Sequence, residues 1–329
     1  MQAPRKKLIT LLLLLVSAIF SCYSAAKPAA EIKISVLKFG TVNWTLETIK
    51  QSQLDNKYGF ELTVQALASS GAGKIALQAN AADIIVSDWT WVARQRGLSS
   101  NYLFAPYSSS AGSIMVPSSS PIRSIEDLVG KKLGIAGGGL DKNWLLLRAL
   151  ALKNNIDLDA KADIVFGAPP LLNSLIKQNE LDALINYWHY SARLKAEGYR
   201  ELINTHQIIR RLGIDTTVPI LGYVFREQWA HRNSSNLNNF LAASRDAANL
   251  LCTSDKHWNR ILPLTRTDDQ STQQLLRSNY CKGRVSVFTE KEKQAIADIY
   301  SILANTGGKQ LVGSVKQLDR KIFWPNNRY

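Results

Sequence analysis

The segment Asn80-Ala-Ala-Asp83-Ile-Ile-Val-Ser-Asp-Trp89 has a second copy in the chain. Asn179-Glu-Leu-Asp182-Ala-Leu-Ile-Asn-Tyr-Trp188 repeats its Asn, Asp and Trp, each 99 residues later. In both copies a helix-like stretch precedes the Asn, and the Asp begins an apolar run of four or five residues. Such a run, bounded by turn residues, is typical of a buried strand. Each copy therefore predicts a helix, a tight turn, a strand and an aromatic residue at the carboxyl end of the strand.

The repeat predicts two similar lobes that share one cleft. About 300 residues follow the first 26, more than a single core usually holds. Ligands of open α/β sheets bind outside the carboxyl ends of the strands. We therefore expect Trp89 and Trp188 to form opposite walls of a ligand cleft. Asp83 and Asp182 stand at the strand starts, remote from that cleft, and we expect them to be structural.

Strand and helix patterns alternate through most of the chain. The order β-α-β-α-β dominates, which predicts an α/β fold with mostly parallel sheets flanked by helices. The apolar segment Val218–Phe225 reads as a strand that carries the chain back to the first lobe. Near the carboxyl end, Thr289-Glu290-Lys291-Glu292 has the form of a capping box. It predicts a helix through Ala304 that Gly307-Gly308 stops.

The first 26 residues have the pattern of a signal peptide. Basic residues 5–7 precede the apolar run Leu8–Phe20, which is too short to span a bilayer comfortably. Small residues favour cleavage after Ala26. The alternative is a lipoprotein box that ends at a lipidated Cys22, although bulky Phe20 fits such a box poorly. We expect a periplasmic protein and favour the cleaved form over the lipid anchor.

Cys252 and Cys281 are the two cysteines outside this leader. In an oxidising compartment an even pair favours a disulfide over free thiols. The bridge would close a loop of about 30 residues and stabilise the fold by about 3 kcal/mol. The alternative is two separately buried thiols.

The chain is basic, with a net charge of +14. A basic chain can bind nucleic acid, but here the basic residues are scattered and the protein is expected to be exported. We expect a basic solvated surface and no nucleic-acid partner. The sequence also has no HExxH, P-loop or GxSxG pattern and no His/Cys cluster with metal-ligand spacing. We therefore expect no catalytic residue, no metal and no cofactor.

Three segments taken in order resemble a known family. Ser69-Ser70-Gly71-Ala72 before a helix, then Ala82-Asp83-Ile84-Ile85, resembles its Ser-Gly turn, helix and Asp-Ile strand. The segment 122–135 resembles its "Ile-x-Ser-x-x-Asp-Leu-x-Gly-Lys-x-Val" opening of the second lobe. The second copy of the repeat resembles its "Gly-x-Val-Asp-Ala … Trp" strand. This family comprises periplasmic solute-binding proteins of ABC importers for nitrate, sulfonate, taurine and thiamine-precursor-like solutes (the NitT/TauT-like family).

The resemblance implies a two-lobed type II periplasmic-binding fold with a hinged cleft between the lobes. Lobe one would comprise residues 31–111 plus 214–329, and lobe two residues 112–213. The protein would be a monomer that captures a small organic solute and delivers it to an ABC permease in the inner membrane. The alternatives on the same scaffold are an exported enzyme and a receptor that reports to a membrane sensor.

Candidate ligand contacts lie in loops that open helices at the expected cleft. Free N–H groups there suit an anion or a carbonyl oxygen, and aromatic walls suit a flat or cationic solute. Asp88–Trp91 and His189-Tyr190 depart from the family pattern, so its common oxyanion ligands are not transferred. We expect a solute with an aromatic or cationic part, with or without an anionic group. The candidates are Trp44, Ser69, Ser70, Gly71, Ala72, Asp88, Trp89, Thr90, Gly139, Asp141, Trp144, Tyr187, Trp188 and His189. The alternatives are core packing for the tryptophans and N-capping or surface solvation for the two Asp residues.

Overall fold

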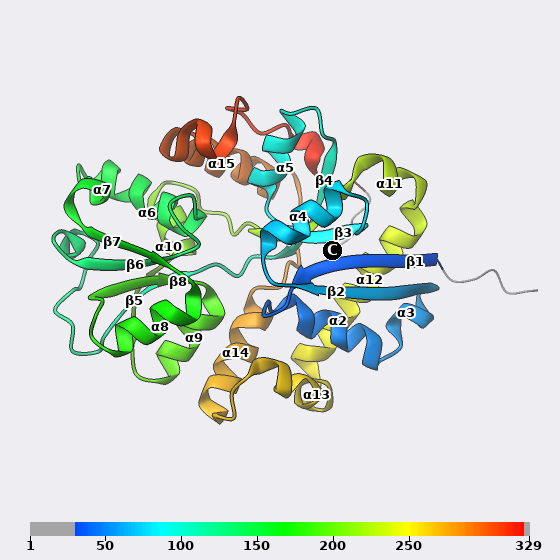
Figure 1. Ribbon diagram of the computed structural model, residues 1–329, viewed down its shortest axis with the longest axis horizontal. Coiled ribbons are helices and arrows are strands. Elements are labelled where there is room, and N and C mark those ends of the chain that lie inside the picture. Colours follow the sequence, from blue (N-terminus) through cyan, green and yellow to red (C-terminus); the bar gives the residue numbers. More distant parts are fainter. Residues whose placement is uncertain (1–29, 326–329) are drawn as a thin grey trace, which may run out of the picture. The chain divides into compact units, whose positions relative to one another are not determined.

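The computed structural model describes residues 30–325, and these residues form two five-stranded sheets flanked by helices (Figure 1). The expected signal peptide and Cys22 lie outside the described residues. The α/β class is confirmed. None of the helices within this range is both long and apolar enough to cross a membrane.

The first sheet collects strands from two separate stretches of the chain, residues 30–108 and 221–226. Its strands are β1 (Ala30–Leu37), β2 (Phe60–Leu67), β3 (Ile84–Ser87), β4 (Tyr102–Ser108) and β10 (Leu221–Arg226). Their order across the sheet is β2-β1-β3-β10-β4. The helices around it are α2 (Val42–Gln51), α3 (Leu54–Lys57), α4 (Ser70–Gln78), α5 (Trp89–Arg96), α11 (Glu227–Arg232) and α12 (Ser234–Thr253). As expected, β10 returns the chain to this sheet.

The second sheet is built from one continuous stretch. Its strands are β5 (Ser113–Val116), β6 (Lys132–Ala136), β7 (Asp163–Gly167), β8 (Ala183–Asn186) and β9 (Arg200–Asn204). Their order is β7-β6-β8-β5-β9. Its helices are α6 (Lys142–Lys153), α7 (Leu158–Lys161), α8 (Pro169–Lys177), α9 (Trp188–Ala196) and α10 (Thr205–Arg211).

Both sheets are mixed instead of mostly parallel. The pairs β1·β3, β6·β7 and β6·β8 are parallel. In contrast, β10 is antiparallel to β3 and β4, and β5 is antiparallel to β8 and β9. The antiparallel strands β5 and β10 are those that the chain enters after crossing from the other sheet. The two crossover segments are residues 109–112 and 212–220.

The sequence repeat has the same structural role in both sheets. Asn80 and Asn179 both adopt the left-handed conformation, with φ of 61° and 60°. The Asp83 side chain accepts a hydrogen bond from the Lys33 backbone amide at 2.9 Å, and Asp182 accepts one from Lys132 at 2.8 Å. The backbone amide of each Asp donates in return to the carbonyl of the same lysine. The structural role predicted for the two Asp residues is confirmed.

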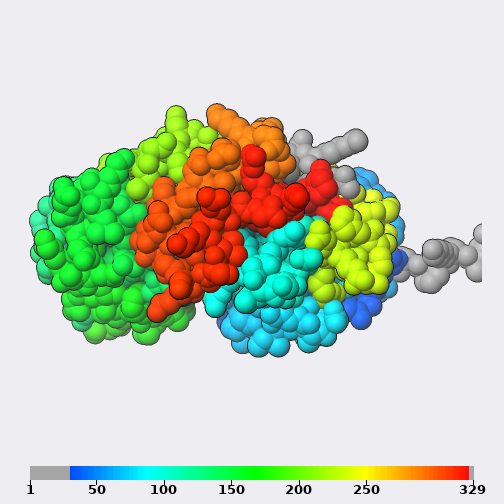
Figure 2. All heavy atoms as spheres, turned by 90° about the horizontal axis from the view of Figure 1, so that it is seen from above, coloured from blue at the N-terminus to red at the C-terminus, as the bar shows by residue number. Residues whose placement is uncertain are grey.

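Three helices complete the carboxyl part: α13 (Asp255–Thr265), α14 (Gln270–Lys282) and α15 (Glu290–Val312). The capping box at Thr289 is confirmed, because Glu292 accepts from the Thr289 backbone amide. α15 continues beyond the expected stop, although Gly308, at φ 59°, breaks its helical geometry. α15 packs against α6 of the second sheet and α5 of the first, and Figure 2 shows its residues lying across both.

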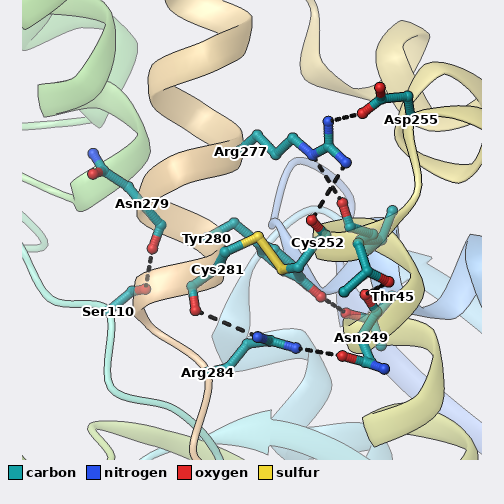
Figure 3. Close-up of a disulfide and its surroundings, with 12 residues drawn as sticks. Thr45, Ser110, Asn249, Cys252, Asp255, Arg277, Asn279, Tyr280, Cys281 and Arg284 are labelled. Carbon is teal, nitrogen blue, oxygen red and sulfur yellow. Dashed lines mark hydrogen bonds and ion pairs between the residues drawn. A yellow bond between two sulfur atoms is a disulfide. The ribbon is translucent and has the colours of Figure 1, made fainter.

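The predicted disulfide between Cys252 and Cys281 is confirmed (Figure 3). It joins the end of α12 to the end of α14, with the two Cα atoms 5.7 Å apart. Arg277 extends the link, because its guanidinium donates to the carbonyls of Leu251 and Cys252 and pairs with Asp255. This arrangement anchors α14, whose other neighbours include α9 of the second sheet.

Candidate functional site

The carboxyl edges of the two sheets meet. The ends of β1 and β2 lie together, since the Lys38 amide donates to the Leu67 carbonyl, and β3 runs parallel to β1. In the second sheet, β6, β7 and β8 are parallel and end at one edge. We call the place where these two edges meet the junction. Two contacts span it: Asp88 pairs with Lys142 at 3.0 Å, and the ring centroids of Trp44 and Trp188 are 6.0 Å apart. This is the edge at which α/β sheets bind ligands.

Asp88 follows β3, and both oxygens of its carboxylate accept hydrogen bonds. One oxygen, Oδ1, caps α5 by accepting from the Trp91 amide at 3.0 Å and also accepts from the Thr90 hydroxyl. The other oxygen, Oδ2, accepts from Lys142 Nζ. Burial opposes ionisation, but Lys142, the Thr90 hydroxyl and Lys74 outweigh it and lower the pKa of Asp88 to about 2. Asp88 is therefore a buried anion at neutral pH.

Two lysines surround this carboxylate. Lys142 is the first residue of α6, and burial acts to lower its pKa, but Asp88 and Asp141 raise it on balance. Lys74 of α4 lies over the Trp91 ring at 5.5 Å. Burial lowers the pKa of Lys74. The positive charges of Lys142 and Arg94 lower it further, whereas the negative charge of Asp88 partly offsets the shift. Neither lysine was among the predicted site residues. Their positions at the carboxyl edge were predictable, but no sequence pattern marks them as ligand contacts.

Asp141 and Tyr187 converge on Gly137. Asp141 caps α6, with its Oδ1 accepting from the amides of Asn143 and Trp144. Gly137 has φ 90°, and a Cβ there would lie 2.6 Å from the Tyr187 hydroxyl and 2.9 Å from Asp141 Oδ2. Burial, reinforced by Asp141, raises the pKa of Tyr187 to about 12. Only glycine permits this close approach.

The tryptophans divide into two groups. Trp89 is completely buried, and its indole donates to the Pro219 carbonyl at 3.0 Å. Trp144 is 1% exposed and also belongs to the apolar core. These two rings fill the core, which was the alternative role. Trp44 and the half-buried Trp188 instead pack together across the junction, with Trp258 and Tyr280 behind Trp44.

The remaining predicted residues have more varied surroundings. Ser69 caps α4 by accepting from the Ala72 amide, and Ser70 and Gly71 are exposed at its start. Gly139 is exposed, and a Cβ there would lie 3.6 Å from the Phe166 ring. Within residues 30–325, the buried Nδ1 of His189 has no hydrogen-bond partner. Burial and Arg193 lower the pKa of His189 to about 3, so the ring is neutral. Ligand contact stays a prediction for all of these residues.

A polar hollow of about 500 Å³ lies beside the junction, between the two sheets. Both crossover segments line it, and Trp188 forms part of its wall. Its charged side chains include Lys195, Glu201, Arg210, Asp215 and Lys282. Trp188 is the only predicted ligand residue that borders it. The described part of the chain contains no group of three or more His, Cys, Asp or Glu placed to hold a metal ion.

Known structures share this two-lobed fold. The alkanesulfonate-binding protein SsuA from Xanthomonas axonopodis pv. citri, bound to MOPS, matches with a TM-score of 0.68 and 16% identity, over 91% of this chain and 99% of that chain. The periplasmic aliphatic sulphonate binding protein SsuA from Escherichia coli matches with a TM-score of 0.70 and 16% identity, over 92% and 94%. An ABC transporter protein from Parabacteroides distasonis matches with a TM-score of 0.68 and 12% identity, over 91% and 100%.

At these identities the three structures establish the fold alone: two α/β lobes of the periplasmic binding protein type. No curated protein matches the chain in sequence. The family model described as "NMT1/THI5 like" matches residues 56–255, which is more than half of the chain. The chain therefore belongs to the NMT1/THI5-like family.

Proposed function

We propose that the protein is the substrate-binding component of an ABC importer and captures a small organic solute between its lobes in the periplasm. The observation that carries this proposal is the junction, where the ligand-binding edges of two linked sheets face each other. Family membership and the shared fold support it. We assign residues 31–111 plus 214–329 to lobe one and residues 112–213 to lobe two.

The partner that follows from this function is a permease of the inner membrane. The signal peptide expected in residues 1–26 supports delivery to the periplasm, with the cleaved form favoured over a lipid anchor at Cys22. The protein would act as a monomer that closes on its solute by rotation about the two crossover segments. No enzymatic step enters this proposal.

The test is direct recovery and measurement of a bound solute. Native mass spectrometry of protein purified from its own periplasm should show one small molecule per chain. Calorimetry should then give one-to-one binding, starting with MOPS and short alkanesulfonates, which the Xanthomonas structure suggests as first probes. A solute at one hundred times its Kd stabilises the protein by about 2.7 kcal/mol, so thermal unfolding should shift upward by several degrees.

Other outcomes separate the alternatives. If purified protein carries no small molecule and a metabolite library produces no thermal shift, the solute-binding function is wrong. A compound recovered in chemically altered form would point to an exported enzyme. A pull-down from solubilised membranes that captures a sensor kinase and no permease would point to a receptor.

A further inference from the structure

A second hollow, of about 340 Å³, lies within lobe one, and we call it the lobe-one hollow. The described residues that line it belong to β4, β10, α12 and the segment 281–286, so it is separate from the junction. Its apolar lining includes Leu241 and Ala248 of α12. Cys281 is part of the lining, whereas Cys252, to which it is bonded, is not. A small molecule in this hollow can therefore approach the disulfide from the Cys281 side.

The charged side chains of the lobe-one hollow all have the same sign. Arg245, Lys282 and Arg284 line it, and none of the described residues in its lining is acidic. Arg284 is held next to the disulfide, because its Nε donates to the Cys281 carbonyl at 3.4 Å and its Nη1 donates to the Asn249 side chain at 3.1 Å (Figure 3). A cluster of positive charge attracts anions and favours a thiolate over a thiol.

The residues around Cys281 also hold the first crossover segment. The Gly283 carbonyl accepts from the backbone amide of Ser109 at 2.8 Å, and the Asn279 carbonyl accepts from the Ser110 hydroxyl at 3.5 Å. A Cβ on Gly283 would collide with the Ser110 side chain, so the two segments are in close contact. A change in the covalent bond of Cys281 therefore acts directly beside a crossover between the lobes.

We propose that Cys281 is a site of thiol–disulfide exchange with a small anionic thiol that enters the lobe-one hollow. The incoming thiolate attacks Sγ of Cys281 and forms a new S–S bond with it. The bond to Cys252 breaks, and the departing Cys252 sulfur takes up the proton that the incoming thiol has lost. The incoming sulfur is oxidised and the Cys252 sulfur is reduced, so the step needs no further oxidant or reductant.

The products are a mixed disulfide on Cys281 and a free thiol on Cys252. α14 then loses its covalent bond to α12 but keeps a noncovalent one, because Arg277 donates to the carbonyls of Leu251 and Cys252. The modification does not require a bound solute. Its failure in the tests below would therefore leave the proposed solute-binding function unaffected.

Two single-cysteine variants compare the two sulfurs. Cys252→Ser leaves the Cys281 thiol, and Cys281→Ser leaves the Cys252 thiol; both lack the bridge, so they form a matched pair. Oxidised glutathione is added to each, and intact-mass spectrometry follows the gain of one glutathione as the other half departs. Because the hollow reaches Cys281 and not Cys252, we expect Cys252→Ser to react about tenfold faster or more. Circular dichroism confirms that both variants are folded, and in urea their rates should become equal.

The charge of the hollow is tested with three disulfide probes. Folded Cys252→Ser should react fastest with anionic oxidised glutathione, more slowly with neutral 2-hydroxyethyl disulfide and most slowly with cationic cystamine. Each rate is divided by the rate in urea, which removes the intrinsic reactivity of the probe. Adding Lys282→Met and Arg284→Met should reduce the preference for glutathione about tenfold. Lys256→Met is the matched control, because Lys256 is exposed on α13 and lies outside the lining.

The wild type, with its bridge intact, gives the final test. It is treated briefly with reduced glutathione, and N-ethylmaleimide then blocks the released thiol. Peptide mapping should find glutathione on Cys281 and the maleimide on Cys252. The proposal is overturned if this pattern is reversed or if no glutathione adduct forms. It is equally overturned if the two single-cysteine variants react at the same rate when folded, or if cystamine reacts as fast as glutathione.

Discussion

Asp88 is the residue whose charge matters most for stability at the junction. Its pKa falls from the ordinary 3.8 to about 2, and a shift of this size corresponds to about 2 kcal/mol. Because the native carboxylate has the lower pKa, this contribution is complete above about pH 4 and is lost as the pH falls toward 2. We predict that Asp88→Asn lowers the free energy of unfolding by about 2 kcal/mol at pH 7.

Urea unfolding at several pH values checks this prediction. The difference in the free energy of unfolding between the wild type and Asp88→Asn should become smaller between pH 4 and pH 2. Asp269→Asn, which changes an exposed capping Asp, should show no comparable difference at pH 7. A gap that persists unchanged at pH 2 would mean that the effect of Asp88 does not come from its ionised carboxylate.

The two tryptophans of the repeat should respond differently to truncation. Trp89 is completely buried and hydrogen-bonded, so Trp89→Ala should cost about 3–5 kcal/mol of stability. Trp188 is half-buried at the junction, so Trp188→Ala should cost less but weaken solute binding. Denaturant unfolding and calorimetry measure the two effects separately. Equal stability losses would contradict the division between core and junction.

At the scale of single elements, the turn between β6 and α6 depends on a glycine pair. Gly137 and Gly138 have φ of 90° and 86°, but only Gly137 has atoms close to an added Cβ. Gly138→Ala should therefore cost about 1 kcal/mol from backbone strain alone, and Gly137→Ala should cost more. Adding Tyr187→Phe to Gly137→Ala should recover part of the difference, because it removes the hydroxyl 2.6 Å away. Thermal unfolding of these three variants and the wild type measures the differences; no recovery in the double variant would exclude the hydroxyl as the cause.

The link between α12 and α14 gives a second prediction at this scale. Cys252→Ser with Cys281→Ser should lower the free energy of unfolding by about 3 kcal/mol, since the loop of about 30 residues is no longer closed. Wild-type protein in reducing agent should lose a similar amount. If reduction has no effect on denaturant unfolding, the disulfide does not contribute to stability.

The sequence predicted the parts of the fold that follow local rules. The repeat, the capping box at Thr289 and the cysteine pair each have a pattern that fixes the structure nearby. α13 and α14 were missed because α13 contains Pro263 and α14 is largely polar, so their packing partners stabilise them more than their own sequences do. Lys142 was missed because the contact that makes it notable comes from the other sheet, 54 residues away in sequence.

At the scale of the whole molecule, the apolar core joins the two sheets. One cluster contains Val92 beside the first sheet, Leu145 beside the second, and Ile299 of α15. We therefore predict that residues 30–325 unfold in one cooperative transition. Near- and far-ultraviolet circular dichroism should give the same melting curve, and calorimetry should show a single peak. Two separated peaks would mean that the lobes are independent.

The break in α15 at Gly308 has a mechanical consequence. Gly307 packs against Leu145 on α6, whereas two residues beyond the break the carbonyl of Gln310 accepts from Arg94 on α5. In the proposed closure the two crossover segments form the hinge, and α15 is a third connection between the two halves, because it packs against both α6 and α5. If the lobes rotate apart as proposed, we predict that the strain falls on Gly308, because its non-helical backbone is the break in α15. A mutation that stiffens Gly308 should then narrow the range of lobe openings seen by small-angle scattering, and an unchanged range would mean that α15 does not limit the opening.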